Sequence, residues 1–372
     1  KGKTWFVNEQ NNTFNKVVFD NDFTEIRVDS LVINSNREVI QFGGVKRDST
    51  YKNLSLKFSD VNIGDLVPAV DSLRLQGGLN GSFSLVQKGK RYYPTSNVTI
   101  DGVVINDINF GDLSIEVAGN EDLTKYNINS TLLNDKVKSF EAIGSIDVSA
   151  DNSYIDLDLI LNKFNLQALS PFGGNIITDI RGLISGKAGV TGDFRSPLVE
   201  GRFDLLNSGL RVVELNTDFK IENNTQLLVT KNKLEIENAT ITDSKFDTQG
   251  YFFGNATHKN FNDWELNLKI EAPERLLVLD TPAKDEALYY GTAFINGSAE
   301  INGPIDELVI DVAASTQDGT SFKIPLSDAQ SIGEDSFIRF LSPEEKQAIV
   351  SGTDFVSEEI KGLSLNFDLD IN

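Results

Sequence analysis

The sequence predicts an all-β protein, an elongated, curved and mainly antiparallel sheet with very little helix. Two observations support this fold class. Apolar and polar residues alternate with a period of two from one end of the chain to the other, and a short glycine-centred signature recurs about every hundred residues. A strand turns successive side chains to opposite faces. The alternation therefore indicates a sheet with one apolar and one polar face, which is typical of antiparallel sheets.

The signature places an apolar residue, a polar residue and a glycine before a further alternating run. Its three copies are residues 79–85, 184–190 and 295–301, and their central glycines lie 105 and 111 residues apart. This spacing exceeds the period of common solenoids, so each unit must hold several strands. We predict one continuous elongated body over residues 1–372. Its approximate repeat units are 1–105, 106–205 and 206–315, and residues 316–372 add further strands and a short helix.

Each unit repeats one order of elements, which is an apolar strand, a crossing segment marked by proline and a strand bent at glycine. The first two crossing segments, residues 62–70 and 164–170, can each form a single helical turn. The best helix prediction is residues 342–351, where Ser342 caps a first turn that contains Pro343 and two glutamates. At about thirteen residues per strand and turn, the chain would hold on the order of 25 to 30 strands.

Composition excludes several classes of function. The formal net charge of −21 repels nucleic-acid phosphates, and the absence of cysteine removes disulfides and thiolate metal sites. No apolar run approaches the ~20 residues of a membrane-spanning helix. The chain contains no methionine, not even an initiator. We therefore expect it to be a segment of a longer protein.

The sequence offers no catalytic or metal-binding constellation. His258 is the only histidine, and no nucleophile motif accompanies it. Paired acids such as Asp156 and Asp158 would share the solvent face of a strand, and no loop has the spacing of a calcium site. We predict no enzymatic activity, no metal and no cofactor.

The apolar positions of the strands are the candidate functional residues. A sheet that curls toward its apolar face without closing would leave a continuous apolar groove, in which each buried methylene of an acyl chain gains about 0.8 kcal/mol. The alternative, that these side chains fill a packed core, stays open at this point. The predicted groove-lining residues, in contact with lipid, are Leu54, Leu56, Phe58, Phe83, Leu85, Leu113, Ile115, Ile155, Leu157, Leu159, Leu161, Leu234, Ile236, Trp264, Leu266, Leu268, Ile270, Leu308, Ile310, Leu363, Leu365, Phe367 and Leu369.

Three phrases, residues 186–205, 318–328 and 363–372, resemble the carboxy-terminal third of the TamB family of bacterial envelope proteins. More distantly, they resemble AsmA-like and bridge-like lipid transfer proteins. The resemblance implies a U-shaped, β-taco sheet in the periplasm, with phospholipid moving along its apolar interior. It also implies association with the outer-membrane barrel protein TamA, and an inner-membrane anchor in a segment absent from this chain.

We therefore predict a scaffold that spans the periplasm of a Gram-negative envelope and carries phospholipid between the inner and outer membranes. Its predicted partners are phospholipid acyl chains, a TamA-type barrel and the inner membrane, and no nucleic acid. Three alternatives remain, of which a secreted β-repeat adhesin gives no reason for a continuous apolar face; the other two are as follows. One is a scaffold or chaperone that assists the assembly of outer-membrane proteins with a TamA-type barrel. The other is a transmembrane β-barrel, although two tryptophans and eight tyrosines are few for aromatic girdles.

Overall fold

The computed structural model describes residues 3–9, 13, 15–66, 74–150, 153–173, 177–259, 262–283, 289–323 and 364–370. Within these residues the chain forms one sheet of 22 strands with two short 3₁₀-helices, which confirms the predicted all-β class. The expectation of about 25 to 30 strands concerned the whole chain, and individual strands within the described residues are long. For example, β12 (Ile177–Asp193) has 17 residues and β18 (Asn262–Thr281) has 20.

The amino-terminal half of the sheet is an antiparallel meander in which each strand from β3 onward pairs with the next. Two short strands, β1 and β2, both pair with β3. These elements are β1 (Phe6–Val7), β2 (Val17–Phe19), β3 (Glu25–Ser35), β4 (Glu38–Arg47), β5 (Tyr51–Asn62), η1 (Ile63–Asp65), β6 (Leu75–Lys88), β7 (Arg91–Ile105), β8 (Ile108–Gly119), β9 (Lys125–Asn134), β10 (Val137–Asp147), β11 (Tyr154–Asn165) and η2 (Leu166–Gly173).

The carboxy-terminal half continues the meander with three variations, one of which is that β20 and β21 both pair with β19. Strands β14 and β15 lie end to end between β13 and β16, and β22 pairs with β20 in parallel. The remaining strands are β13 (Leu198–Val212), β14 (Thr217–Ile221), β15 (Thr225–Thr230), β16 (Lys233–Asp243), β17 (Gln249–Lys259), β19 (Tyr290–Pro304), β20 (Val309–Thr316), β21 (Ser321–Lys323) and β22 (Ser364–Asp370).

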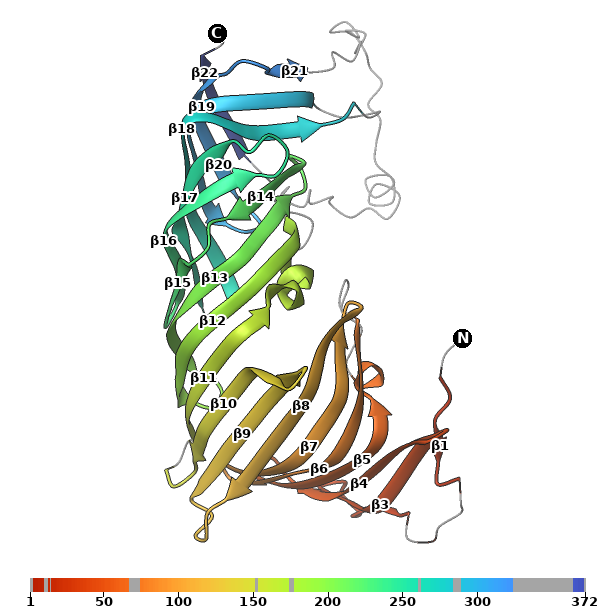
Figure 1. The fold of residues 1–372 in the computed structure, drawn as a ribbon. Helices are drawn as coiled ribbons and strands as arrows, with labels where there is room; N and C mark the ends of the chain where they lie inside the picture. The colour runs from red at the N-terminus through yellow and green to blue at the C-terminus, as the bar shows by residue number, and fades with distance from the viewer. Residues whose placement is uncertain are drawn as a thin grey trace, which may run out of the picture.

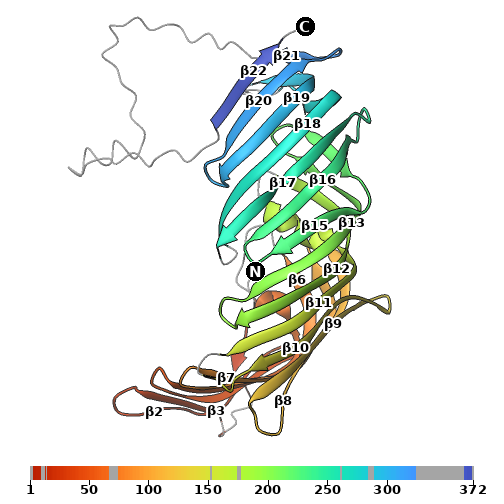
Figure 2. The ribbon, with the colours of Figure 1, turned by 90° about the vertical axis from the view of Figure 1, so that its left-hand side faces the viewer.

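The sheet is elongated and strongly curved. Strands follow one another from the amino-terminal end to the carboxy-terminal end, and the chain draws a C in Figure 1 because β3–β8 turn away from the direction of β11–β19. Seen from the side in Figure 2, the strands lie oblique to the long axis of the molecule. Among the pairings of the described residues, none joins β1–β8 to β18–β22, so the sheet stays open.

The predicted crossing segments contain the two helices. The helix η1 lies inside predicted residues 62–70, and η2 begins two residues after the predicted start of its segment at residue 164 and ends beyond it. The predicted helix at residues 342–351 lies outside the described residues. The boundaries of the repeat units stay a prediction.

The polar residue of each signature holds a bulge in the preceding strand. The Asn80 Oδ1 accepts a hydrogen bond from the Asp60 backbone N–H (2.8 Å), and the Ser185 Oγ accepts one from the Lys163 N–H (2.8 Å). In the third copy, the Asn296 side chain donates to the Pro273 carbonyl (2.6 Å). The cross-strand register shifts at all three places. A bulge bends and twists a strand, so the signature curves the sheet once per repeat.

The glycine of each signature permits close approach of the next strand. At Gly186 the backbone φ is +156°, and an added Cβ would lie 2.2 Å from the Arg202 carbonyl oxygen. An added Cβ at Gly81 would lie 2.0 Å from the Asn97 carbonyl oxygen. Only glycine fits such positions without moving a neighbouring backbone.

We predict that Gly186→Ala lowers the free energy of unfolding by about 2 kcal/mol or more, because its Cβ would meet the Arg202 backbone. Gly189→Ala is the matched control in the same strand, since a Cβ at that position has open space and needs no unusual φ. The control should change the free energy of unfolding by about 0.5 kcal/mol or less. Urea denaturation of both variants measures the difference, and equal stabilities would contradict this role of Gly186.

Candidate functional site: the apolar face of the sheet

An unbroken row of apolar and glycine residues crosses the sheet from β5 to β22. Residues directly opposite one another on neighbouring strands share a face, so the row defines one side of the whole sheet. In pairing order it consists of Val61, Leu79, Ile100, Leu113, Leu132, Phe140, Leu161, Gly186, Phe203, Leu227, Ile236, Gly254, Leu268, Ile301, Ile310 and Leu365.

A parallel row on the same face is also apolar with one exception, Ser130. The Ser130 hydroxyl donates to the Ser114 carbonyl (3.0 Å), so it presents no unpaired polar group. In pairing order this row consists of Phe58, Gly81, Val98, Ile115, Ser130, Ala142, Leu159, Ala188, Gly201, Val229, Leu234, Ala256, Leu266 and Gly303. We call the side of the sheet that carries these two rows the apolar face.

The opposite face carries mostly polar residues at the intervening positions. Ile160 and Leu228 are the apolar members of the row that runs Thr99, Ser114, Thr131, Glu141, Ile160, Lys187, Arg202, Leu228, Glu235, Asn255, Asn267 and Asn302. The separation between the two faces is therefore maintained across the sheet.

Several charges of the polar face pair with one another. The Arg181 guanidinium makes two hydrogen bonds of 2.8 and 2.7 Å to the Asp218 carboxylate. Burial raises the pKa of Asp218, but hydrogen bonds from the Ser244 hydroxyl and from Arg181 outweigh it and hold that pKa below its ordinary value. The Lys269 Nζ lies 2.9 Å from the Glu271 Oε1, and the hydrogen bond between them raises the pKa of Lys269. These pairs support the sheet without reaching the apolar face.

The predicted groove residues lie on the apolar face and are only partly covered. Of those in strands β5 to β20 whose side chains the structure describes, Ile155 is buried (8% exposed) and the others are half-buried. Side chains in a packed core would be almost fully buried. Leu308 lies in the connection before β20 rather than in a strand, and Leu363 lies outside the described residues. The backbone positions of Leu365, Phe367 and Leu369 pair with those of Ile310, Val312 and Ala314.

The alternating pattern of the sequence did not predict every residue of the apolar face, because each bulge shifts the alternation by one residue. Phe58 and Val61 share the face although they are three residues apart, since the bulge between them adds one residue. Leu161 and Phe164 are related in the same way. The sequence does contain a signal for these two bulges, which is the polar residue of the signature. Asn80 marks the bulge before Val61, and Ser185 marks the bulge before Phe164.

The buried side chains form five clusters in series along the apolar face. The first joins Val61 and Leu79 to neighbouring strands, and the last joins Leu276 and Ile295. In these clusters, within the described residues, no side chain of β3–β6 packs against one of β8–β20. The two arms of the C therefore do not fill each other's apolar face.

The sheet curls toward its apolar face in the middle of the molecule. The rings of Phe110 in β8 and Phe164 in β11 lie 5.8 Å apart and belong to one apolar cluster. Three strand spacings in a flat sheet would separate them by about 14 Å. The helix η2 adds Leu166 and Ala168 to the same side of the sheet. The apolar face is therefore the concave face here.

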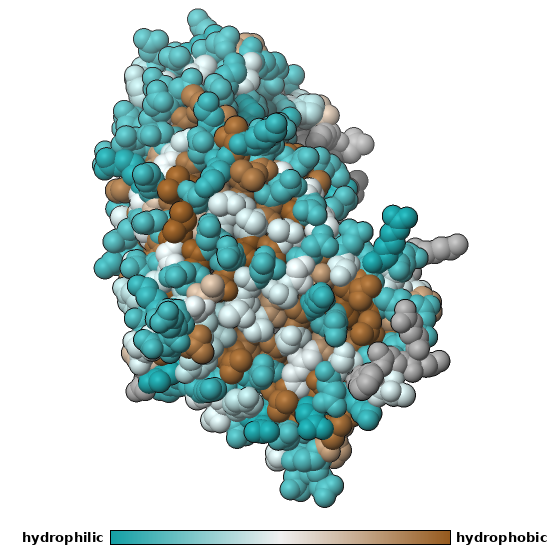
Figure 3. Space-filling model, turned by 60° about the horizontal axis from the view of Figure 1, so that its bottom comes forward, coloured by the Kyte–Doolittle hydropathy of each residue, from teal (hydrophilic) through white to brown (hydrophobic). Residues whose placement is uncertain are grey.

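Apolar side chains also reach the molecular surface. Figure 3 shows them in several patches across the middle of the molecule, interspersed with white and hydrophilic side chains. Exposed apolar patches often mark contact surfaces for a ligand or a partner.

The described residues contain no group of three or more His, Cys, Asp and Glu side chains that could hold a metal ion. His258 is buried, and its ring lies 4.7 Å from that of Trp264 at the end of the β17–β18 hairpin. Among the helices within the described ranges, none is long and apolar enough to cross a membrane.

Comparison with known proteins identifies the carboxy-terminal part of the chain. Residues 237–372, which begin within β16, match the family model of the TamB C-terminal domain. The chain matches no curated protein and no solved structure. The matched range contains two of the three sequence phrases, residues 318–328 and 363–372, and confirms the resemblance there. Residues 237–372 are therefore similar in sequence to the TamB C-terminal domain.

Proposed function

We propose that this chain is part of a scaffold that spans the periplasm of a Gram-negative envelope and carries phospholipid between the inner and outer membranes. The apolar face of the sheet is the path, an open groove lined by the two apolar rows. The observation that supports this most strongly is the row from Val61 to Ile310, which crosses the sheet without a polar residue. The similarity of residues 237–372 to the TamB C-terminal domain supports the proposal.

The energetics of such a path follow from its composition. Each methylene that leaves water gains about 0.8 kcal/mol, so an acyl chain on the apolar face replaces the environment it had in a bilayer. Leu, Ile, Val and Phe side chains offer no directional partner. The bound chain therefore meets similar walls at successive strands and can move from one to the next.

The proposed partners lie at the two ends of this path. They are a TamA-type barrel in the outer membrane at one end and the inner membrane at the other. The polar face and its ion pairs, such as Arg181 with Asp218, would face the aqueous periplasm.

One observation favours a second function, assistance in the assembly of outer-membrane proteins. Within the described residues, β22 pairs with β20 alone, which leaves one side of β22 open to another strand. Such an edge can add a strand from a partner. Under this alternative the sheet edge, rather than the apolar face, would contact the substrate.

We predict that Leu268→Arg strongly reduces lipid carriage, because it places a charge in the middle of the apolar row. The matched control is Asn267→Arg, which adds the same charge one position away on the polar face. Phospholipid extracted from the purified proteins and quantified by mass spectrometry should fall several-fold in L268R and stay near wild type in N267R. Equal lipid content in the two variants would contradict the proposal.

Photocrosslinking in cells distinguishes the two candidate functions. A photoreactive residue at position 157 or 268, on the apolar face, should capture phospholipid, whereas one at position 156 or 267 should not. Mass spectrometry identifies the attached molecules. Capture of barrel proteins in place of lipid at positions 157 and 268 would reject the lipid path and favour the assembly function.

A further inference from the structure

Three turns that are distant in sequence meet at one margin of the sheet. They are the β6–β7 turn, the connection from β10 to β11 and the β12–β13 turn. The Arg91 Nε donates to the Ala150 carbonyl (3.1 Å), and the Phe194 N–H donates to the Ser153 carbonyl (2.9 Å). The Arg195 Nη2 donates to the Tyr92 hydroxyl (3.1 Å), across a sequence separation of 103 residues. In a flat sheet, β7 and β12 would be about 24 Å apart. These contacts therefore fix the curl of the sheet.

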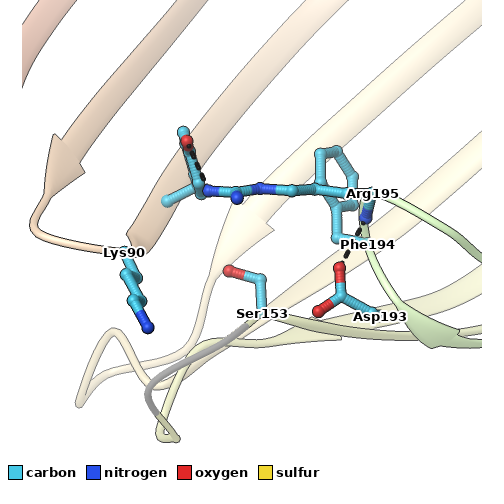
Figure 4. Close-up of a pocket in the computed structure, with 6 residues that line it drawn as sticks. Lys90, Ser153, Asp193, Phe194 and Arg195 are labelled. Atoms are coloured by element: carbon cyan, nitrogen blue, oxygen red, sulfur yellow. Dashed lines mark hydrogen bonds between the residues drawn. The ribbon is translucent and has the colours of Figure 1, made fainter.

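A shallow recess lies where the three turns meet, and Figure 4 shows the residues that line it. They are Lys90, Tyr92, Ser153, Asp193, Phe194 and Arg195. The recess combines two cationic side chains with one carboxylate, in a chain whose formal net charge is −21. An excess of positive charge at one place on such a protein points to an anionic ligand.

The two cations of the recess are available for a ligand. Among the described residues, no carboxylate lies within salt-bridge distance of Lys90 or Arg195. The Arg195 guanidinium uses one N–H for the Tyr92 hydroxyl and keeps others for further acceptors. The Asp193 Oδ1 accepts the Arg195 backbone N–H (2.9 Å), which offsets part of its charge.

The hydroxyl of Ser153 provides an independent indication of a ligand. Ser153 is 5% exposed, and its Oγ has no hydrogen-bond partner in the protein. A buried hydroxyl without a partner costs about 1–3 kcal/mol, so this site favours an incoming polar atom. In Figure 4 the hydroxyl points toward the space between Lys90 and the Arg195 side chain.

We propose that this recess binds a phosphate group. The Lys90 ammonium and the Arg195 guanidinium each bind phosphate oxygens, and the Ser153 hydroxyl donates to one more. The recess is shallow, so most of the phosphate would stay at the surface between the two cations. Among the described lining residues, Lys90, Arg195 and Asp193 together carry a net charge of +1, which matches a phosphodiester monoanion.

The place of the recess suits a phospholipid headgroup. Tyr154, the first residue of β11, pairs with Asp193, and the apolar residues Ile155, Leu157 and Leu159 follow along that strand. A headgroup in the recess would therefore leave its acyl chains beside the apolar face. If the phosphate belongs to a phospholipid headgroup, the inference rests on the proposed function. If it is free phosphate, the inference is independent of that function.

The test is isothermal titration calorimetry of the purified chain with inorganic phosphate and, separately, with dihexanoylphosphatidylglycerol below its micellar concentration. We expect saturable binding that weakens roughly tenfold in Lys90→Gln and in Ser153→Ala, the loss expected for one charge-assisted or buried hydrogen bond. Lys231→Gln, at the exposed β15–β16 turn, removes the same charge elsewhere and should bind as wild type.

The two ligands distinguish the two sources of phosphate. Tenfold tighter binding of the lipid identifies a headgroup site, and equal binding of both identifies a site for the phosphate group alone. Absence of saturable binding, or binding unaffected by both K90Q and S153A, would overturn the proposal.

K90Q leaves the three turn contacts intact, and thermal unfolding of S153A checks its fold. L268R should retain phosphate binding here, so failure of the lipid path and failure of this recess give different results.

Discussion

The cross-strand register of the sheet is the constraint on which the rest of the structure depends. Because side chains alternate between faces, a shift of one residue in any strand would move its apolar side chains to the polar side. The row from Val61 to Ile310 passes through every intervening pairing without such a shift. Bulges change the register locally, and a signature side chain such as Asn80 or Ser185 holds the extra residue in place. The same feature therefore bends the sheet and keeps its two faces separate.

The curvature of the sheet makes its apolar face a candidate binding surface for an apolar ligand. A flat sheet with this pattern would expose its apolar face to water or pack it against a second layer. Here the contacts between Phe110 and Phe164 and between Tyr92 and Arg195 draw the apolar face inward over the middle strands. The packed clusters lie along that face rather than across it, and most of its predicted residues remain half-buried. An apolar ligand on this face would bury the side chains that the polypeptide itself covers only in part.

The sequence was sufficient for the fold class, for the two faces and for the positions of η1 and η2, because these follow from local periodicity and from proline and glycine. It did not show the lengths of individual strands, since nothing local indicates that β18 continues through Pro273 as one strand of 20 residues. It missed Val61 and Phe164 because a bulge changes the parity of the pattern. The recess at Lys90, Ser153 and Arg195 was beyond its reach, since turns so distant in sequence meet only through the curl of the sheet.

The central claim is that the concave apolar face is left unfilled by the chain itself. A density map of the protein purified without detergent tests this most directly, by cryo-electron microscopy of the full-length protein or by crystallography of this chain. The account predicts elongated density along the row from Leu161 to Leu268, unconnected to the polypeptide. A map in which side chains of β3–β6 interlock with those of β12–β19, with no space between them, would contradict it.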